Sequence, residues 1–190
     1  MARLVLASAS PRRRELLLDA GIECVVRPVD VDETVRPGEV PEQVVVRLSR
    51  AKADAVVATG AGPLVVAADT VAAVGAEVLA KPRDRADAAR ILRRLSGTRH
   101  RVLTGVTLVD VEADERETWI ATTDVTMRRL AELEIEAYVA TGEADGKAGA
   151  YAIQETGDRF VVGINGSFDT VVGLPVDVVQ GWLRRRDRRG

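Results

Sequence analysis

The chain has 190 residues and a formal net charge of −2, and 46% of its residues are hydrophobic and 29% charged, as is typical of a soluble globular protein. This charge balance gives no global attraction to nucleic acid or to an acidic membrane, and an aromatic content of 3% argues against a stacking platform for single strands. No apolar stretch is long enough to span a membrane, and only a short apolar run precedes Ser8, so we expect a cytoplasmic protein without a signal peptide.

The first segment combines a strand with an unusual helix start. Residues 4–6 form an apolar run typical of a buried strand, and Ser10 and Pro11 suit the start of a helix expected over residues 13–20. Three consecutive arginines at positions 12–14 occupy its first turn, where the helix dipole makes each exposed cation unfavourable by a few tenths of a kcal/mol to about 1. Two interpretations stay open: a phosphate site, or a solvated helix start whose arginines pair with acids elsewhere.

A strand over residues 22–29 and a helix over residues 41–59 are predicted next. The single cysteine, Cys24, is interpreted as a small residue of that strand and cannot form an internal disulfide. Lys52 lies at the edge of the helix's apolar stripe. It either extends to solvent or points into a cleft, and the spacing alone favours solvent.

The next predicted strand contains a carboxylate. Residues 64–74 form an apolar run, and a return strand over residues 77–82 ends near Lys81. Asp69 interrupts the first run. Because burying an unpaired carboxylate is costly, Asp69 needs a partner, a metal or a place at the open end of the strand.

The rest of the chain continues the mixture of helices and hairpins. The predicted elements are a helix beginning at residues 83–87 and ending at Gly97, strands over 100–111 and 117–127, a helix over 130–141, a glycine-rich loop over 142–154 that enters a strand, a strand over 160–164, and a last helix ending near residue 186. His100 is interpreted as a structural residue at a strand start, and one histidine leaves no His/Cys metal cluster. No repeat or long linker is present, so we predict one α/β domain over residues 1–190 with a mixed sheet.

Polar side chains collect where the predicted strands end, namely Ser8, Ser10, Asp32, Glu33, Asp69, Thr70, Lys81 and Gln154. Ligands of open α/β sheets bind at such ends. Basic groups that hold phosphates, together with carboxylates that hold a metal and activate water, suit metal-assisted hydrolysis of a phosphoanhydride. The sequence has no Walker-type glycine loop, which argues against a P-loop enzyme.

A set of short motifs runs along nearly the whole chain: Ser8-Ala9-Ser10-Pro11-Arg12-Arg13, Val31-Asp32-Glu33, Ala68-Asp69-Thr70, Leu79-Ala80-Lys81-Pro82-Arg83-Asp84, Leu95-Ser96-Gly97, Asp145-Gly146-Lys147-Ala148-Gly149-Ala150-Tyr151, Asn165-Gly166-Ser167 and residues 171–175. In this order they resemble the Maf family of nucleoside triphosphate pyrophosphatases. The resemblance implies a twisted mixed sheet with flanking helices and two lobes around a deep cleft, as in inosine triphosphate pyrophosphatases. It also implies hydrolysis of a nucleoside triphosphate to the monophosphate and pyrophosphate, with a divalent cation, Mg²⁺ or Mn²⁺.

The resemblance also implies roles for individual residues. Asp69 matches the proton acceptor of the family, and Glu33 and Asp69 would place the cation. The triphosphate would be held by Arg13, Lys52 and Lys81, with its oxygens received by Ser8, Ser10 and the helix N-terminus.

Three further positions concern the base. Arg12, Thr70 and Gln154 match the specificity positions of the branch acting on dTTP and UTP, whereas the branch acting on 7-methyl-GTP looks different there. Glu155 and Phe168 depart from this branch, which usually has glycine and tyrosine at these places. The expected substrates are dTTP and UTP, with modified pyrimidine nucleotides as further candidates.

Two other functions stay open at this point. One is a non-catalytic nucleotide-binding regulator of septum formation and cell division, and the other is an inosine or xanthosine triphosphate pyrophosphatase. The retained Glu33, Asp69, Lys52 and Lys81 speak against an inactive enzyme. The resemblance also leaves a homodimer open, with no nucleic acid or membrane partner expected.

Overall fold

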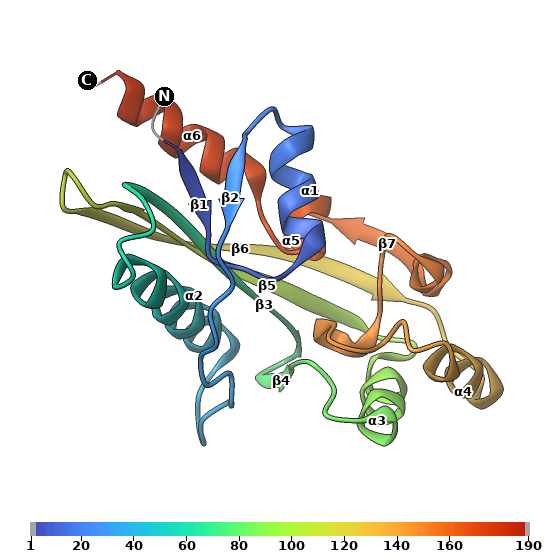
Figure 1. The fold of residues 1–190 in the computed structure, drawn as a ribbon. Coiled ribbons are helices and arrows are strands. Elements are labelled where there is room, and N and C mark those ends of the chain that lie inside the picture. The colour runs from blue at the N-terminus through green and yellow to red at the C-terminus, as the bar shows by residue number, and fades with distance from the viewer. Residues whose placement is uncertain (1–2, 189–190) are drawn as a thin grey trace.

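A mixed sheet forms the centre of the molecule, and the computed structural model describes residues 3–188 (Figure 1). Its strands within this range are β1 (Leu4–Leu6), β2 (Cys24–Val26), β3 (Leu64–Val74), β4 (Glu77–Leu79), β5 (Arg99–Asp110), β6 (Glu115–Met127) and β7 (Val161–Asn165). Their spatial order is β2-β1-β3-β5-β6-β7, with β4 paired to β3. The β1 strand runs parallel to β2 and β3, and the other pairs are antiparallel. The prediction of an α/β fold with a mixed sheet is confirmed.

Helices gather at two ends of the long strands. Within the described range they are α1 (Pro11–Asp19), α2 (Pro41–Val57), α3 (Arg85–Leu95), α4 (Glu132–Ala140), α5 (Phe168–Val172) and α6 (Val176–Asp187), with 3₁₀ turns η1 (Ala148–Ala150) and η2 (Thr156–Phe160). Figure 1 shows α1, α2 and α6 around the part of the sheet that contains β1 and β2, and α3 and α4 at the opposite end. The expected two-lobed arrangement is therefore present. Within residues 3–188, no helix is long and apolar enough to cross a membrane.

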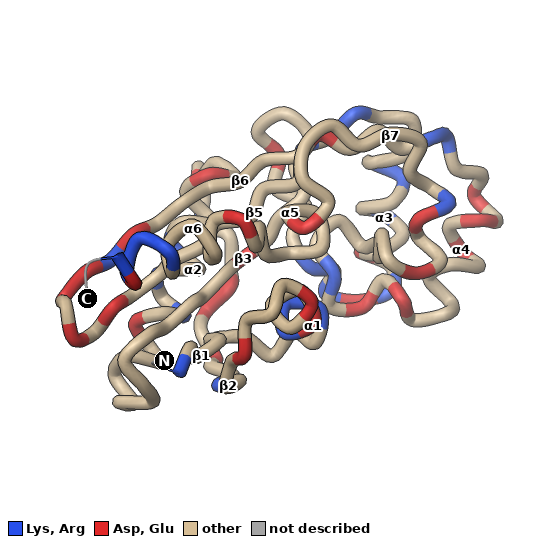
Figure 2. Tube along the Cα trace, turned by 90° about the horizontal axis from the view of Figure 1, so that it is seen from above, with Lys and Arg blue, Asp and Glu red and all other residues tan. Residues whose placement is uncertain are grey.

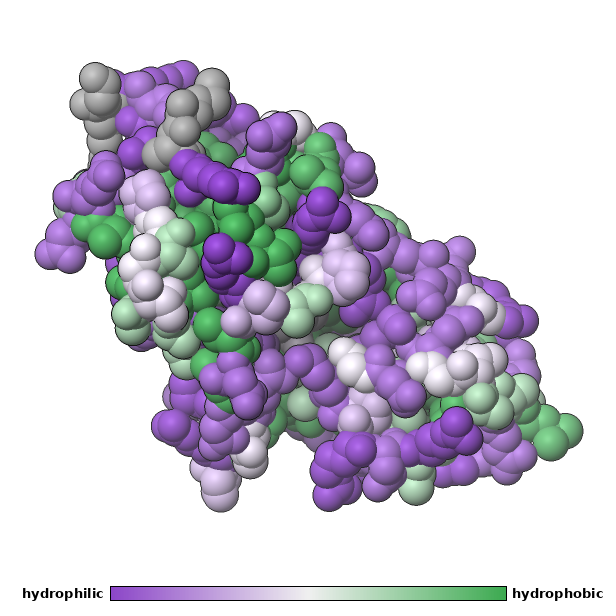
Figure 3. Space-filling view, viewed as in Figure 1, coloured by the Kyte–Doolittle hydropathy of each residue, from purple (hydrophilic) through white to green (hydrophobic). Residues whose placement is uncertain are grey.

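The apolar run of β1 is buried on both faces of the sheet. Leu6 packs in one cluster with Leu17 of α1 and Trp182 of α6, and Val5 packs in another with Val56 of α2. Because successive strand residues point to opposite faces, a strand covered on both sides reads as a continuous apolar run. Outside these layers, the face seen in Figure 3 is largely hydrophilic, with hydrophobic residues showing mainly over β1 and β2.

The end of α6 is held against the turn that joins β5 and β6. Figure 2 shows the basic end of this helix beside that acidic turn. Arg186 Nε lies 2.6 Å from Asp110 Oδ2, and Arg185 Nη2 lies 2.8 Å from Glu117 Oε2. These ion pairs tie the C-terminal helix to the strands that cross the sheet.

Three local expectations differ from the structure. The second strand is limited to Cys24–Val26, because its neighbour β1 offers only three residues to pair with. The glycine-rich loop does not enter a strand. Gly149 and Ala150 have φ values of 72° and 58°, in the left-handed region, and η1 forms there instead. The helix α5 was not expected, and Ser167 begins it by accepting a hydrogen bond from Thr170 N.

The contact between α2 and β5 depends on a residue without a side chain. A Cβ atom at Gly105 would lie 2.3 Å from the carbonyl oxygen of Val45, a backbone atom that cannot rotate away. We therefore expect Gly105→Ala to lower the free energy of unfolding by about 1–3 kcal/mol. Urea denaturation would measure the shift in midpoint.

A matched control is Gly163→Ala in β7, where the nearest atom to the new Cβ is Thr126 Cβ at 4.0 Å. That variant should unfold within about 0.5 kcal/mol of the parent protein. Equal stability of the two variants would contradict the close approach of α2 to β5.

Candidate active site

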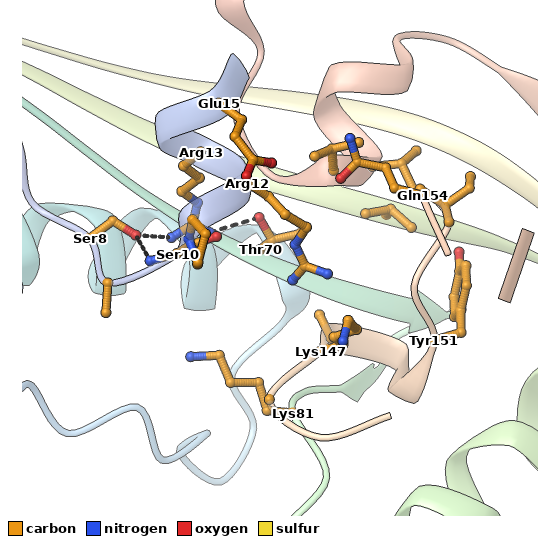
Figure 4. A pocket seen from close by; sticks show the side chains of 18 of the residues that line it. Ser8, Ser10, Arg12, Arg13, Glu15, Thr70, Lys81, Lys147, Tyr151 and Gln154 are labelled. Carbon is orange, nitrogen blue, oxygen red and sulfur yellow. Dashed lines mark hydrogen bonds between the residues drawn. The ribbon is translucent and has the colours of Figure 1, made fainter. Parts of the chain in front are cut away.

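A cavity of about 720 Å³ lies beside the N-terminus of α1 and reaches the segment around η1. Its wall contains nearly all the predicted site residues, namely Ser8, Ser10, Arg12, Arg13, Glu33, Lys52, Thr70, Lys81 and Gln154. Asp69 is not part of the wall, but it contacts Lys52, and Lys52 is a wall residue. Figure 4 shows Ser8, Arg13 and Thr70 joined by hydrogen bonds on one side of the cavity, with Gln154, Lys147 and Tyr151 on the other. Segments far apart in the sequence thus meet around one space.

Arg13 is buried in the wall of the cavity, and each of its three guanidinium nitrogens donates one hydrogen bond. Its Nε donates to the Gly173 carbonyl at 2.8 Å, its Nη1 to Ser8 Oγ at 3.2 Å and its Nη2 to Thr70 Oγ1 at 3.1 Å. Burial lowers the pKa of Arg13, and the charges of Asp69 and Glu33 oppose that shift. Among the described residues, no carboxylate forms an ion pair with it. For Arg13, the interpretation as a solvated surface charge is therefore wrong.

The helix that carries Arg13 presents an open N-terminus to the same cavity. Ser10 is its N-cap residue, yet the Ser10 side chain makes no capping hydrogen bond. Instead the backbone N–H of Ser10 donates to Ser8 Oγ at 3.1 Å. The N–H groups of the first turn thus lack a side-chain acceptor, which is the arrangement that accepts anionic oxygens in many proteins.

Lys52 binds two carboxylates at once. Its Nζ lies 2.6 Å from Asp69 Oδ1 and 2.6 Å from Glu33 Oε1, and Lys81 Nζ lies 2.5 Å from Glu33 Oε2. The Lys52 side chain is only 7% exposed, so the expectation that it extends to solvent is wrong. Its position has a physical cause, because β3 places the buried Asp69 against α2 and a buried carboxylate requires a compensating charge. Of the three alternatives that the sequence left open for Asp69, the structure shows a partner, and this partner is Lys52.

Two lysines keep Glu33 ionised. Burial of Glu33 opposes the charged form, but the hydrogen bonds from Lys52 and Lys81 outweigh this effect and lower the pKa of Glu33 to about 2. Glu33 thus enters the cavity as an anion at neutral pH.

The hydroxyl of Thr70, in the cavity wall, is held by Thr104 behind it. Thr70 Oγ1 lies 2.9 Å from Thr104 Oγ1, and Thr104 donates to the Thr170 carbonyl at 2.8 Å. Together with the hydrogen bond from Arg13, these contacts fix the hydroxyl of Thr70. Thr70, the residue next to Asp69, is thus oriented directly by α1 and β5, and Thr170 of α5 in turn fixes Thr104.

The sequence analysis did not assign Lys147, Tyr151 or Glu155 to the site, although all three line the cavity. Lys147 Nζ lies 3.6 Å from Glu155 Oε1. The available signal was a lysine inside a glycine-rich loop, since glycines at positive φ let a backbone approach a ligand closely. Glycine clusters alone were too general to indicate this wall.

A family model described as "Maf-like protein" matches residues 3–186. The chain belongs to this family. The resemblance seen in the motifs is thereby confirmed.

Several similar members of the family are named as enzymes. The "dTTP/UTP pyrophosphatase" of Anaeromyxobacter dehalogenans (strain 2CP-C) is 52% identical over 189 residues, covering 96% of this chain and 93% of that protein. The protein of the same name from Geotalea uraniireducens (strain Rf4) is 48% identical over 184 residues, covering 97% and 95%. Among solved structures, a HAM1 protein from Coxiella burnetii is 20% identical, covers 68% of this chain and 75% of that chain, and superposes with a TM-score of 0.45.

His100 lies behind the cavity wall of this Maf-like protein. It is 1% exposed, and its Nε2 lies 2.9 Å from the hydroxyl of Tyr151. Burial lowers the pKa of His100 from its usual 6.5 to about 4, against an opposing effect of Asp124. The unfolded chain therefore binds a proton at pH values where the folded protein does not.

This difference predicts an acid-dependent loss of stability. The neutral His100 contributes fully to the free energy of unfolding above pH 6.5. As the pH falls toward 4, the free energy of unfolding decreases by up to about 3 kcal/mol. Urea denaturation between pH 4 and pH 8 would measure it. In His100→Gln this part of the pH dependence should vanish, and an unchanged pH profile would contradict the buried neutral histidine.

Proposed function

We propose that this Maf-like protein hydrolyses dTTP and UTP to the monophosphate and pyrophosphate. The observation that carries the proposal is the contact of Glu33 and the buried Asp69 with the buried Lys52, beside a cavity lined by further arginines and lysines. Relatives named dTTP/UTP pyrophosphatase, about half identical over nearly their whole length, support the same activity. Cations that hold phosphates next to ionised carboxylates suit attack of water on a phosphorus atom.

In this proposal the triphosphate binds at the N-terminus of α1. Arg13 presents a planar guanidinium group that matches phosphate oxygens, and Lys81 adds a second cation from the opposite wall. The free N–H groups of the first turn and the hydroxyls of Ser8 and Ser10 add hydrogen bonds. Lys52, already shared between Glu33 and Asp69, completes the positive wall.

Glu33 and Asp69 are the proposed holders of Mg²⁺ or Mn²⁺. No group of three or more histidine, cysteine, aspartate or glutamate side chains that could hold a metal occurs in the part of the chain that the structure describes. Mg²⁺ is usually bound by one or two carboxylates together with substrate phosphates, so two carboxylates that share Lys52 beside the cavity fit it. When bound, the ion supplies Lewis-acid polarisation of phosphoryl oxygens.

Asp69 is the proposed proton acceptor. Its Oδ1 accepts a hydrogen bond from Lys52, and no other side-chain hydrogen bond to it occurs within residues 3–188. Its Oδ2 therefore stays available to accept a proton from water. As the water oxygen bonds to the α-phosphorus, the bond to the bridging oxygen breaks and pyrophosphate leaves. A positioned carboxylate in this role contributes about 10²–10⁴ to the rate.

Replacement of Asp69 tests the catalytic role. We expect Asp69→Asn to abolish pyrophosphate release while nucleotide binding stays within about tenfold, because the phosphate-binding cations remain. Steady-state kinetics and calorimetric binding of dTTP would measure the two effects. A residual rate above about a tenth of the parent rate would exclude Asp69 as the general base.

Asp110 provides the matched control for that substitution. It is a buried aspartate of the same sheet, paired with Arg186 and outside the cavity wall. Asp110→Asn should keep the parent rate, so a loss of activity in both variants would indicate a general effect on folding.

The base is proposed to contact Gln154, Arg12 and Thr70. An amide such as Gln154 offers both a donor and an acceptor to the O4–N3 edge of uracil or thymine, whereas Arg12 offers donors only. Cytosine presents an amino donor where uracil presents O4, and an unpaired buried polar group costs about 1–3 kcal/mol. This chemistry favours UTP and dTTP over CTP by roughly tenfold to a hundredfold per lost contact.

A nucleotide panel tests this preference. We expect kcat/KM for UTP and dTTP to exceed the values for CTP and the purine triphosphates, including inosine and xanthosine triphosphate. Gln154→Ala should reduce the preference more than it lowers the best rate, whereas Gln180→Ala, on the outer helix α6, should leave both unchanged. Similar kcat/KM for UTP, CTP and GTP would contradict the assignment, and no release of pyrophosphate from any of them would favour a non-catalytic regulator.

A further inference from the structure

Glu33 stands on a segment that has no regular structure of its own. Residues 27–40, between β2 and α2, contain neither helix nor strand. Glu33 nevertheless reaches Lys52 on α2 and Lys81 beyond β4 in a defined geometry. Something other than secondary structure must therefore hold this segment, because a free loop would place the carboxylate in many positions.

One guanidinium group contacts the backbone on both sides of Glu33. Arg47 Nη2 donates to the Thr34 carbonyl at 3.0 Å, and Arg47 Nη1 donates to the Asp32 carbonyl at 3.5 Å. These carbonyls belong to the residues directly before and after Glu33. The spacing of the two contacts means that the peptide units around Glu33 cannot shift without losing them.

The same guanidinium group also forms a bidentate ion pair. Its Nε lies 2.6 Å from Glu39 Oε1, and its Nη2 lies 2.7 Å from Glu39 Oε2. Glu39 Oε2 in turn accepts a hydrogen bond from the backbone N–H of Arg36 at 3.0 Å. The hydrogen bond from Arg47 is the main cause that lowers the pKa of Glu39 to about 2, so this pair is ionised at neutral pH. The far end of the segment is thus fastened to the same side chain.

We propose that Arg47 is a positioning residue that holds the backbone on both sides of Glu33 and so places the Glu33 carboxylate between Lys52 and Lys81. The proposal rests on the proposed function of Glu33 in the active site. Arg47 itself lines a separate groove on the outer side of this segment and is absent from the wall of the active-site cavity. Among the described residues, its hydrogen bonds reach only the segment that carries Glu33.

The geometry requires arginine at this position. A guanidinium group offers five N–H donors in a fixed plane, which lets one side chain reach a carboxylate and two carbonyls together. A lysine keeps the charge but has a single nitrogen, and it cannot reproduce the bidentate contact. The α2 helix thus holds the segment at two points. Arg47 donates hydrogen bonds to the backbone of the segment, and Lys52 forms an ion pair with the Glu33 side chain.

Arg47→Lys is the test, measured by hydrogen exchange and by kinetics on the full-length protein. We expect faster exchange at the amides of Thr34, Arg36 and Glu39, which are hydrogen-bonded within the segment, with no change in the β3 and β5 amides. We also expect kcat/KM with dTTP to fall, and the Mg²⁺ concentration for half-maximal rate to rise, by about tenfold to a hundredfold, the usual effect of losing a group that orients a ligand.

Two other variants separate the contacts. Arg50→Lys is the matched control, since Arg50 lies on the same helix and, among residues 3–188, donates only to Thr118 Oγ1. This variant should match the parent protein in every measurement. Glu39→Gln removes the ion pair but leaves both carbonyl contacts of Arg47, so it should give a smaller change than Arg47→Lys in both exchange and Mg²⁺ dependence.

Several results would overturn the proposal. One is an Arg47→Lys protein whose residues 30–40 exchange like those of the parent, and another is faster exchange spread evenly over α2 and the sheet. Faster exchange confined to the segment, with unchanged Mg²⁺ dependence and kcat/KM, would also overturn it. If the parent protein hydrolyses no nucleotide, the proposed function fails by itself. Calorimetry of Mn²⁺ binding in the presence of dTTP would then test the positioning role without activity. Equal affinity for Mn²⁺ in the parent protein and in Arg47→Lys would overturn it.

Discussion

The single ammonium group of Lys52 makes two carboxylates, the buried Asp69 and the partly exposed Glu33, compatible in one small space. Glu33 comes from an irregular segment and Asp69 from the middle of β3, and both lie 2.6 Å from the same nitrogen. Without a cation between them, two neighbouring carboxylates repel, and one of them takes up a proton. Removing one partner of a buried ion pair typically costs about 3–5 kcal/mol. The chemistry proposed for this cavity therefore depends on Lys52, a residue that the helical periodicity of the sequence places at the surface.

The remaining charges of the cavity divide into paired and unpaired groups. The lysines are paired, Lys81 with Glu33 and Lys147 with Glu155. Among the described residues, Arg12 and Arg13 have no carboxylate within ion-pair distance. The uncompensated positive charge therefore lies at the N-terminus of α1, where the helix dipole adds to it. The cavity thus has its unpaired positive charge beside the helix N-terminus, and its lysines are paired with carboxylates.

Part of this arrangement could be predicted from the sequence, because polar residues that end neighbouring strands of an open sheet must meet at one edge. Ser8, which follows β1, lies in the cavity wall as that rule predicts. Thr70 and Glu33 also line the cavity, but Thr70 lies inside β3 and Glu33 on the irregular segment after β2, so strand ends did not place them. Helical periodicity failed for Lys52, since a lysine beside an apolar stripe looks the same whether its partner is water or a buried carboxylate on another strand. Arg47 left no signal at all, because its partners include backbone carbonyls, which every residue has.

The hydrogen bond from Arg13 to the carbonyl of Gly173 joins residues that are 160 positions apart in the chain. During synthesis the N-terminal part of a protein emerges first, so β1 and α1 are available long before Gly173 has been made. Until that last portion docks, the guanidinium group lacks one of the three contacts that orient it. An unfinished or truncated chain therefore holds most of the cavity wall without a correctly aimed Arg13. The wall proposed to bind phosphate is complete only when the last part of the chain has docked on α1.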